Sequence, residues 1–140
     1  MLRSVLHSLL SMKEAHRLII TNGTQFLLGF RHPDDREGGK WNIMGGKADE
    51  GEDSKQAAKR EIKEEAGIDV EPDVLTFIDR YNDWITYYYL AFYNGEIGEG
   101  DDEHTEIKWF DFSDIFALNL AFNHLDVLVD FLEKFSDRLE

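Results

Sequence analysis

The chain of 140 residues contains no cysteine, and no apolar run approaches the ~20 residues needed to span a bilayer. The absence of cysteine excludes disulfides and thiolate metal sites, and it suits a reducing compartment, so we expect a cytoplasmic protein. Met1–Leu10 is apolar, but Arg3 and His7 interrupt it and no small-residue cleavage site follows. We therefore do not interpret this segment as a secretion signal.

Residues 1–12 have two interpretations. In the first, they form a short N-terminal helix that packs on the domain. In the second, Met12-Lys13 is the true start and the preceding residues are a disordered extension.

Positive charge is scarce, because 15 Lys and Arg stand against 29 Asp and Glu and the formal net charge is −14. Nucleic-acid backbones and anionic membranes both attract patches of Lys and Arg, so we expect neither DNA nor a membrane as a partner. A phosphorylated small molecule is compatible with this charge, since bound divalent cations reverse the local field.

The composition is that of a globular protein, with 42% hydrophobic and 13% aromatic residues. Its length predicts one domain over residues 1–140 with a sizeable core, of which residues 1–12 are a candidate extension. No internal repeat or linker is visible. The sequence is compatible with a monomer or a homodimer.

Strand and turn signals dominate the first part of the chain. Asn22-Gly23 is a strong two-residue hairpin signal, and the loop that follows the hairpin is rich in polar residues, Pro33 and glycine. The predicted elements are strands at Ala15–Thr21 and Gln25–Arg31, a mobile loop at His32–Lys40, and a short apolar segment at Trp41–Met44 that leads into Gly45-Gly46.

The second part of the chain predicts further strands and a final helix. The order of strands, helix, strands and helix indicates an α+β layered domain. The predicted elements are strands at Val74–Tyr81 and Trp84–Tyr93 joined near Asn82-Asp83, an acidic loop at Gly95–His104, a strand at Ile107–Phe112 and a helix at Asn123–Leu139.

Between these parts, Ser54–Ala66 predicts a helix with clear ends. Asp53 is a suitable N-cap, and Gln56 three residues later completes a capping box. Gly67 suits the left-handed residue that ends a helix.

This helix carries an acidic face beside an apolar one. With about 100° per residue, Glu65 lies about 40° to one side of Glu61 and Glu64 about 60° to the other, with the small Ala57 between them. Ala58, Ile62 and Ala66 form the adjacent apolar stripe. Ala57 therefore leaves room for a ligand beside the acids.

The spacing of charges argues against an ordinary solvated face. Surface helices gain stability from Glu and Lys at i, i+4, yet here Glu61 is followed by Glu65, and Lys59 by Lys63. Crowded carboxylates repel one another unless a cation sits among them. The pattern therefore favours a metal site.

The ligand types indicate a hard cation. Gly45-Gly46 lets the backbone approach a ligand closely, and a glycine carbonyl together with carboxylates suits Mg²⁺, with Mn²⁺ as a substitute. No two histidines stand at the i, i+4 spacing of a metal pair; the histidines are His7, His16, His32, His104 and His124.

Gly46 to Ile68 resembles the Nudix box, which reads Gly, five residues, Glu, seven residues, then Arg-Glu-aliphatic-x-Glu-Glu-x-Gly-aliphatic. Every fixed position of the box is filled. The matching residues are Gly46, Glu52, Arg60, Glu61, Ile62, Glu64, Glu65, Gly67 and Ile68. The flanking hairpin and the C-terminal helix also fit the family, so the resemblance extends from Lys13 to the end.

The resemblance implies an α/β/α sandwich around a central mixed β-sheet. It also implies hydrolysis of a nucleoside diphosphate linked to another group, with Mg²⁺ as cofactor. By position, Glu61, Glu64 and Glu65 are the implied metal ligands, assisted by the Gly45 carbonyl. Arg60 is implied to orient the acids.

Two roles stay open within this resemblance. Glu52 is implied to support the loop and the helix, or to help hold a metal through water. The general base is Glu61 or a carboxylate of the acidic loop before Trp109, either Glu103 or Glu106, and those two are also candidate metal ligands.

Substrate recognition lies outside the box. Arg31 stands where MutT-type members place a phosphate-binding arginine, and Lys47 is a second candidate for phosphate. Trp41 and Trp84 are candidates to stack on a base or simple core residues. Asn123 is a candidate base reader, because an amide donates and accepts together, or a helix N-cap.

The leading prediction is a MutT-like nucleoside triphosphate pyrophosphohydrolase that releases a nucleoside monophosphate and pyrophosphate, with oxidised guanine nucleotides among its substrates. Hydrolysis of ADP-ribose or a nucleotide sugar is the alternative, followed by capped RNA or dinucleoside polyphosphates. A non-catalytic Nudix-like binding or regulatory module is the alternative of another class.

Overall fold

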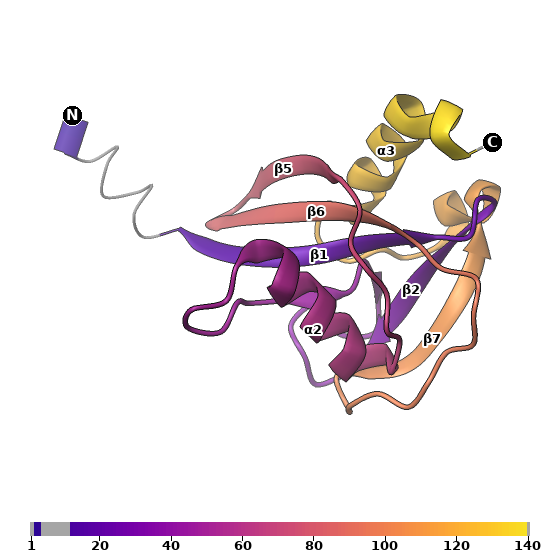
Figure 1. The fold of residues 1–140 in the computed structure, drawn as a ribbon, viewed down its shortest axis with the longest axis horizontal. Coiled ribbons are helices and arrows are strands. Elements are labelled where there is room, and N and C mark those ends of the chain that lie inside the picture. The colour runs from indigo at the N-terminus through magenta and orange to yellow at the C-terminus, as the bar shows by residue number, and fades with distance from the viewer. Residues whose placement is uncertain (1, 4–11, 140) are drawn as a thin grey trace.

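A mixed sheet with a long helix on each face forms the fold, in a computed structural model that describes residues 2–3 and 12–139 (Figure 1). The strands are β1 (Lys13–Thr21), β2 (Gln25–Arg31), β3 (Trp41–Asn42), β4 (Gly45–Gly46), β5 (Leu75–Tyr81), β6 (Trp84–Phe92) and β7 (His104–Asp111). The helices are α2 (Ser54–Ala66), the 3₁₀ helix η1 (Phe112–Ala117) and α3 (His124–Leu139). The two interpretations of residues 1–12 fall almost wholly outside the described residues.

The sheet is mixed because its central pair is parallel. The strand order is β3-β2-β1-β6-β5, with β4 also paired to β1 and β7 to β2. β1 runs parallel to β6 from the Lys13–Trp84 pair to the Thr21–Phe92 pair. The other pairings are antiparallel. This arrangement confirms the predicted α+β sandwich with a mixed sheet.

Alternation along the strands divides the core into two layers. Successive strand residues point to opposite faces, so Leu18 and Ile20 face α2 whereas Ile19 faces α3. The α2 layer is closed by Ala58, Ile62 and Ala66, and the α3 layer by Val127, Leu128 and Phe131, all buried. Each apolar stripe predicted from the sequence therefore covers one face of the sheet.

Helix α2 has the predicted bounds and caps. The Asp53 carboxylate accepts a hydrogen bond from the Gln56 amide, and the Gln56 side chain accepts one from the Asp53 amide. Gly67 adopts a left-handed φ of 64° and its amide donates to the Lys63 carbonyl. The caps hold the register of the helix, and that register decides where its acids point.

One predicted turn is confirmed and the other shifts by a residue. Asn82-Asp83 connects the paired Tyr81 and Trp84, with Asn82 at a left-handed φ of 55°. In the first hairpin, Thr21 pairs with Phe26, which puts the turn at Gly23-Thr24 instead of Asn22-Gly23. The Asn22 carboxamide oxygen accepts hydrogen bonds from the backbone amides of Thr24 and Gln25, so the Asn22 side chain stabilises the turn.

Strand β7 begins at His104, three residues before the predicted start at Ile107. The prediction was wrong because Thr105 and Glu106 are polar and exposed, so they show no apolar pattern. Their strand geometry comes from pairing with β2, which extends to Arg31 opposite His104 across a register shift. This pairing brings the acidic loop to the edge of α2.

No helix among residues 2–3 and 12–139 combines the length and apolar character required to cross a membrane.

The layer beneath α3 provides a stability test. Phe131 is fully buried and contacts Phe26 and Phe135, whereas Phe116 on η1 is 66% exposed. We expect Phe131→Ala to lower the free energy of unfolding by about 3–5 kcal/mol, through lost burial and the cavity left behind. The matched control Phe116→Ala is expected to change it by about 0.5 kcal/mol or less. Urea denaturation followed by circular dichroism measures both, and equal losses would contradict this packing.

Candidate functional site

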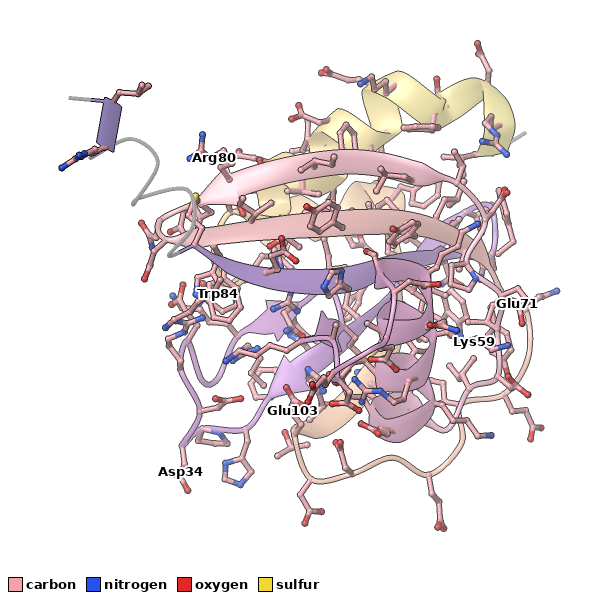
Figure 2. All side chains as sticks on the ribbon, turned by 60° about the vertical axis from the view of Figure 1, so that its left-hand side comes forward. Asp34, Lys59, Glu71, Arg80, Trp84 and Glu103 are labelled. Carbon is pink, nitrogen blue, oxygen red and sulfur yellow. The ribbon has the colours of Figure 1, made fainter. Side chains whose placement is uncertain are left out.

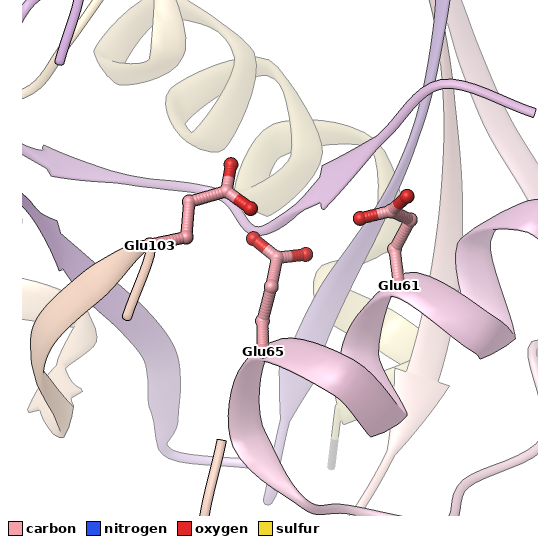
Figure 3. Close-up of side chains that lie close together, drawn as sticks. All are labelled: Glu61, Glu65 and Glu103. Atoms are coloured by element: carbon pink, nitrogen blue, oxygen red, sulfur yellow. The ribbon is translucent and has the colours of Figure 1, made fainter. Parts of the chain in front are cut away.

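Three carboxylates from two distant parts of the chain converge beside α2. Glu61 and Glu65 stand one turn apart on the helix, and Glu103 approaches from the residue before β7 (Figure 3). One oxygen of each lies within 4.8 Å of the others. We call these three residues the acid cluster.

Glu65 is the most buried of the three, with 1% of its surface exposed. Neither of its carboxylate oxygens has a hydrogen-bond partner among the described residues. Burial, followed by the charges of Glu103 and Glu61, raises the pKa of Glu65 well above its ordinary value. The positive charge of Arg17 opposes this shift of the pKa but is outweighed.

The other two acids are perturbed in the same direction. Burial raises the pKa of Glu61, against the opposing charge of Arg60. Burial, with the charge of Asp101 next, raises the pKa of Glu103. Three acids that resist ionisation together form a site whose anionic state requires a cation.

The residues of the acid cluster fit a hard divalent cation. Carboxylate oxygens are the donors that Mg²⁺ and Mn²⁺ prefer, and the unpaired oxygens of Glu65 are free to bind one. Gly46 gives the cluster its space, because a Cβ there would lie 2.6 Å from the Glu61 carboxylate. Gly45 has a φ of 154°, and its Cβ would lie 2.2 Å from the His16 carbonyl oxygen, so the close approach to β1 requires glycine.

Arg60 organises the outer side of α2. Its Nε and Nη2 donate to the two oxygens of Glu52 at 2.8 and 3.1 Å, and Nη2 also donates to the Lys47 carbonyl at 3.0 Å. Its Nη1 lies 3.1 Å from Glu61 and donates to both oxygens of Glu64 at 3.0 Å. The guanidinium therefore ties the loop after β4 to the helix.

Two of the acids named from the sequence as direct metal ligands lie outside the acid cluster. Glu64 is half-exposed and its carboxylate is engaged by Arg60. Glu106 is exposed on β7, 3.4 Å from Lys108. Glu103, the other candidate from the acidic loop, is the one that the fold places beside Glu61 and Glu65.

A cleft of about 440 Å³ opens beside the acid cluster. Its lining combines the acids Glu61, Glu103 and Asp35 with cations and two aromatic rings, and Asp35 lies 3.1 Å from Arg31. The lining residues include Arg17, Arg31, Arg36, Lys47, Trp84 and Phe122. Among the residues predicted for substrate binding, Arg31 and Lys47 therefore lie in the cleft.

Cations surround the two aromatic rings of the cleft. The Arg36 guanidinium lies 5.2 Å from the centroid of Trp84 and 5.3 Å from that of Phe122. The Lys47 ammonium lies 5.4 Å from Trp84, and the Arg31 guanidinium 5.1 Å from Phe122. Both rings thus present faces beside positive charge (Figure 2 labels Trp84 and Glu103).

A smaller recess next to the cleft contains Asn123. Its lining shares Arg17, Arg36, Trp84 and Phe122 with the cleft. The Asn123 amide nitrogen donates to Asp79 at 2.6 Å, and its backbone carbonyl accepts from Val127 in the first turn of α3. Asn123 thus holds the N-cap position of the helix while its side chain is directed to Asp79.

The two tryptophans considered for base stacking lie in different places. Trp41 packs edge-on against Phe30 and Phe110, with centroid distances of 5.0 and 4.7 Å, and belongs to the α3 layer. Trp84 lines the cleft and the recess. Pairing of β3 with β2 draws Trp41 into the core.

Sequence reasoning missed three residues of the cleft: Arg17, Arg36 and Phe122. For Arg17 a signal existed, because it is a charged residue directly before the apolar run Leu18–Ile20 of a buried strand. Its guanidinium donates to the Ile43 carbonyl at 2.5 Å. Phe122 has an unusual left-handed φ of 53°, and the sequence contains no sign of it.

Comparison with known families and curated proteins agrees with the box. A family model described as the NUDIX domain matches residues 13–131. The chain is 33% identical over 78 residues to the zebrafish (Danio rerio) protein named 8-oxo-dGDP phosphatase NUDT18, and 34% identical over 77 residues to the Homo sapiens protein of that name. These matches cover 52% and 51% of this chain and 24% of each relative, so the chain spans about a quarter of the length of these relatives.

Solved structures share the fold over nearly the whole chain. A MutT NUDIX hydrolase from Burkholderia pseudomallei is 27% identical with a TM-score of 0.72, covering 84% of this chain and 95% of that one. A MutT protein from Methanosarcina mazei Go1 is 25% identical with a TM-score of 0.71, covering 90% and 94%. Together with the family match over residues 13–131, the complete box and the sandwich fold show that this chain belongs to the Nudix domain family.

Proposed function

We propose that this chain is a divalent-cation-dependent pyrophosphohydrolase that acts on oxidised guanine nucleotides. Water attacks a phosphorus of the 5′-diphosphate unit and the phosphoanhydride P–O bond breaks, which gives the nucleoside monophosphate and either phosphate or pyrophosphate. The observation that carries this proposal is that Glu61 and Glu103 of the acid cluster line the same cleft as four cationic side chains.

The acid cluster is the proposed metal site. Glu61 and Glu65 are the central ligands, and the Gly45 carbonyl and Glu64 complete the proposed set. A divalent cation there neutralises the diphosphate and lowers the pKa of bound water. Arg60 supports the set by fixing Glu52, Glu61 and Glu64 relative to the loop after β4.

Glu103 is the carboxylate that we assign as general base. Glu61 lies 3.1 Å from Arg60, and this contact favours its anionic, metal-binding form. The described residues include no ion-pair partner within 4.0 Å of Glu103, and burial raises its pKa toward the neutral range in which a base works best. It also lines the cleft where a water would attack.

Other residues that line the cleft and the recess suit the rest of a nucleotide. Arg31 and Lys47, with Arg17 beside them, are the proposed phosphate contacts. Trp84 takes the stacking role for which Trp41 was also a candidate, because it offers a ring to the cleft. Asn123, held by Asp79 in the recess, is the proposed reader of the base edge.

The choice of oxidised guanine rests on the names of the relatives. NUDT18 is named for a deoxynucleoside diphosphate, whereas the leading prediction from the sequence was a triphosphate. Both cleavages use the same chemistry at phosphorus, so the two substrates differ only in the leaving group.

A nucleotide panel with carboxamide variants tests the catalytic assignment. We expect hydrolysis of 8-oxo-dGDP or 8-oxo-dGTP only with Mg²⁺ or Mn²⁺, and losses of kcat of about 10²–10⁴-fold in Glu61→Gln, Glu65→Gln and Glu103→Gln. Glu106→Gln, on the exposed part of β7, is expected to retain activity. ADP-ribose in the same panel tests the alternative substrate. If Glu106→Gln lowers kcat as much as Glu103→Gln does, the assignment of Glu103 as general base is refuted. If no substrate is hydrolysed, a non-catalytic binding module is favoured.

The raised pKa values predict that stabilisation by Mg²⁺ grows with pH. Above the ordinary glutamate value of 4.5, native Glu61, Glu65 and Glu103 hold protons that the unfolded chain has lost. Their contribution to stability therefore falls as pH rises through the raised pKa values. Because the cation binds the ionised acids, it offsets this loss of stability. The stabilisation of the folded protein by Mg²⁺ is therefore expected to be larger at higher pH.

Thermal denaturation in Mg²⁺ and in EDTA measures this difference at each pH. Buried histidines with lowered pKa values, such as His16 and His124, contribute to both curves and largely cancel. At about 100 times Kd the expected gain is about 2.7 kcal/mol. Glu65→Gln should remove most of the gain, and an Mg²⁺ effect that shrinks as pH rises would contradict the assignment.

The recess predicts a separate effect on specificity. Asn123→Ala removes a group that donates and accepts, while leaving the acid cluster intact. We expect the ratio of kcat/KM for 8-oxo-dGTP over dGTP to fall by about 10-fold or more, since a lost base-edge contact costs about 1–3 kcal/mol. If the ratio does not move, Asn123 serves only as the helix cap. Asp79→Asn, which keeps the size of its partner, separates positioning of Asn123 from direct reading.

A further inference from the structure

A buried histidine lies between Glu65 of the acid cluster and Asn42, which contacts Arg31 of the cleft. His104 directly follows Glu103, is 7% exposed, and contributes no atom to the cleft lining. Its Nδ1 lies 3.4 Å from Glu65 Oε1, and neither atom has a hydrogen-bond partner among the described residues. The proposed mechanism leaves this imidazole without a role.

The far side of the ring determines which nitrogen carries the proton. Asn42 contacts two groups whose roles are fixed: the Gly29 carbonyl only accepts, and the Arg31 guanidinium only donates. The Asn42 amide nitrogen therefore faces Gly29 O at 3.2 Å and its oxygen accepts from Arg31 Nη1 at 2.9 Å. In the opposite orientation, the Asn42 oxygen would face the Gly29 carbonyl oxygen, and the Asn42 nitrogen would face the Arg31 guanidinium.

In that orientation the Asn42 nitrogen also donates to His104 Nε2 at 2.8 Å. Nε2 is then an acceptor, so a neutral imidazole carries its proton on Nδ1. Nδ1 then carries the only donor of the ring, 3.4 Å from the Glu65 Oε1 that likewise has no hydrogen-bond partner among the described residues.

The ring is closely packed against β2. A Cβ on Gly29 would lie 2.5 Å from His104 Cδ2, so the imidazole rests directly on the backbone of β2. Arg31, at the other end of the chain of contacts, is also held by its Nε bond to the Arg36 carbonyl at 2.7 Å. Hydrogen bonds therefore connect Arg31, Asn42 and His104, and the Nδ1 side of the ring lies 3.4 Å from Glu65.

We propose that His104 is a positioning residue that holds Glu65 for the metal through its Nδ1–H, with its tautomer set by Asn42 and Arg31. The inference rests on the proposed function, because it takes Glu65 as a metal ligand. Hydrogen bonds to metal-binding carboxylates orient their remaining lone pairs, and their loss typically weakens metal binding by about 10–100-fold. The proposed phosphate contact and the metal site are thereby linked through the protein interior.

A matched pair of amide substitutions isolates the Nδ1 donor. The side-chain nitrogen of asparagine stands where Nδ1 does, whereas that of glutamine reaches the position of Nε2. We expect His104→Gln to weaken Mn²⁺ binding in the absence of nucleotide by about 10–100-fold, measured by electron paramagnetic resonance of free Mn²⁺. His104→Asn is expected to stay within a few-fold of the wild type. Equal weakening in both variants, with both folded by circular dichroism, would overturn the proposal.

Two further measurements keep the proposal distinct from the proposed function. Nitrogen-15 NMR of the metal-free protein should show His104 protonated at Nδ1, and protonation at Nε2 would overturn the tautomer assignment. In His104→Gln, half-maximal activity should require about 10–100-fold more Mg²⁺ while the KM for nucleotide stays nearly constant. If the wild type hydrolyses no nucleotide but Mn²⁺ binding responds as expected, the proposed function fails and the role of His104 stands.

Discussion

The structure depends on one buried carboxylate, Glu65, that lies beside two others. Glu65 is almost inaccessible, and Glu61 and Glu103 add negative charge within a few ångströms. Burying an unpaired charged group costs more than the roughly 1–3 kcal/mol of a neutral one, and a protein without a cation escapes that cost only by keeping protons. The capped α2, the glycines of β4 and the Arg60 contacts all maintain a geometry that is unfavourable by itself. The proposed divalent cation would offset that cost.

Acids and cations line the same cleft. Arg17, Arg31, Arg36 and Lys47 lie there with Glu61, Glu103 and Asp35, although the chain as a whole is strongly acidic. A cation bound to phosphate oxygens can meet both kinds of side chain at once, because the metal contacts the acids and the remaining oxygens contact the arginines. This arrangement of charge suits the proposed polyphosphate substrate, which the net charge alone would not suggest.

Much of the fold followed from local pattern. The bounds and caps of α2, the Asn82-Asp83 turn and the two-layered core were predictable, because helix periodicity, capping residues and strand alternation act over a few residues. The start of β7 was not predictable, since Thr105 and Glu106 become strand only by pairing with β2. The Gly23-Thr24 turn was missed for a similar reason: the register of the whole hairpin, and not the Asn-Gly pair alone, decided which residues turn.

In the candidate site, too, some features follow from local sequence and others from the pairing of distant strands. The sequence by itself determined that Glu61 and Glu65 stand one turn apart on a helix behind a glycine approach, because residues at i and i+4 lie on the same side of a helix. Only the tertiary structure decided that Glu103 and not Glu106 joins them, that Trp84 and not Trp41 faces the cleft, and that His104 stands behind Glu65. Those choices depend on which distant strands pair and in what register, as when the pairing of β7 with β2 sets the position of Glu103 and His104.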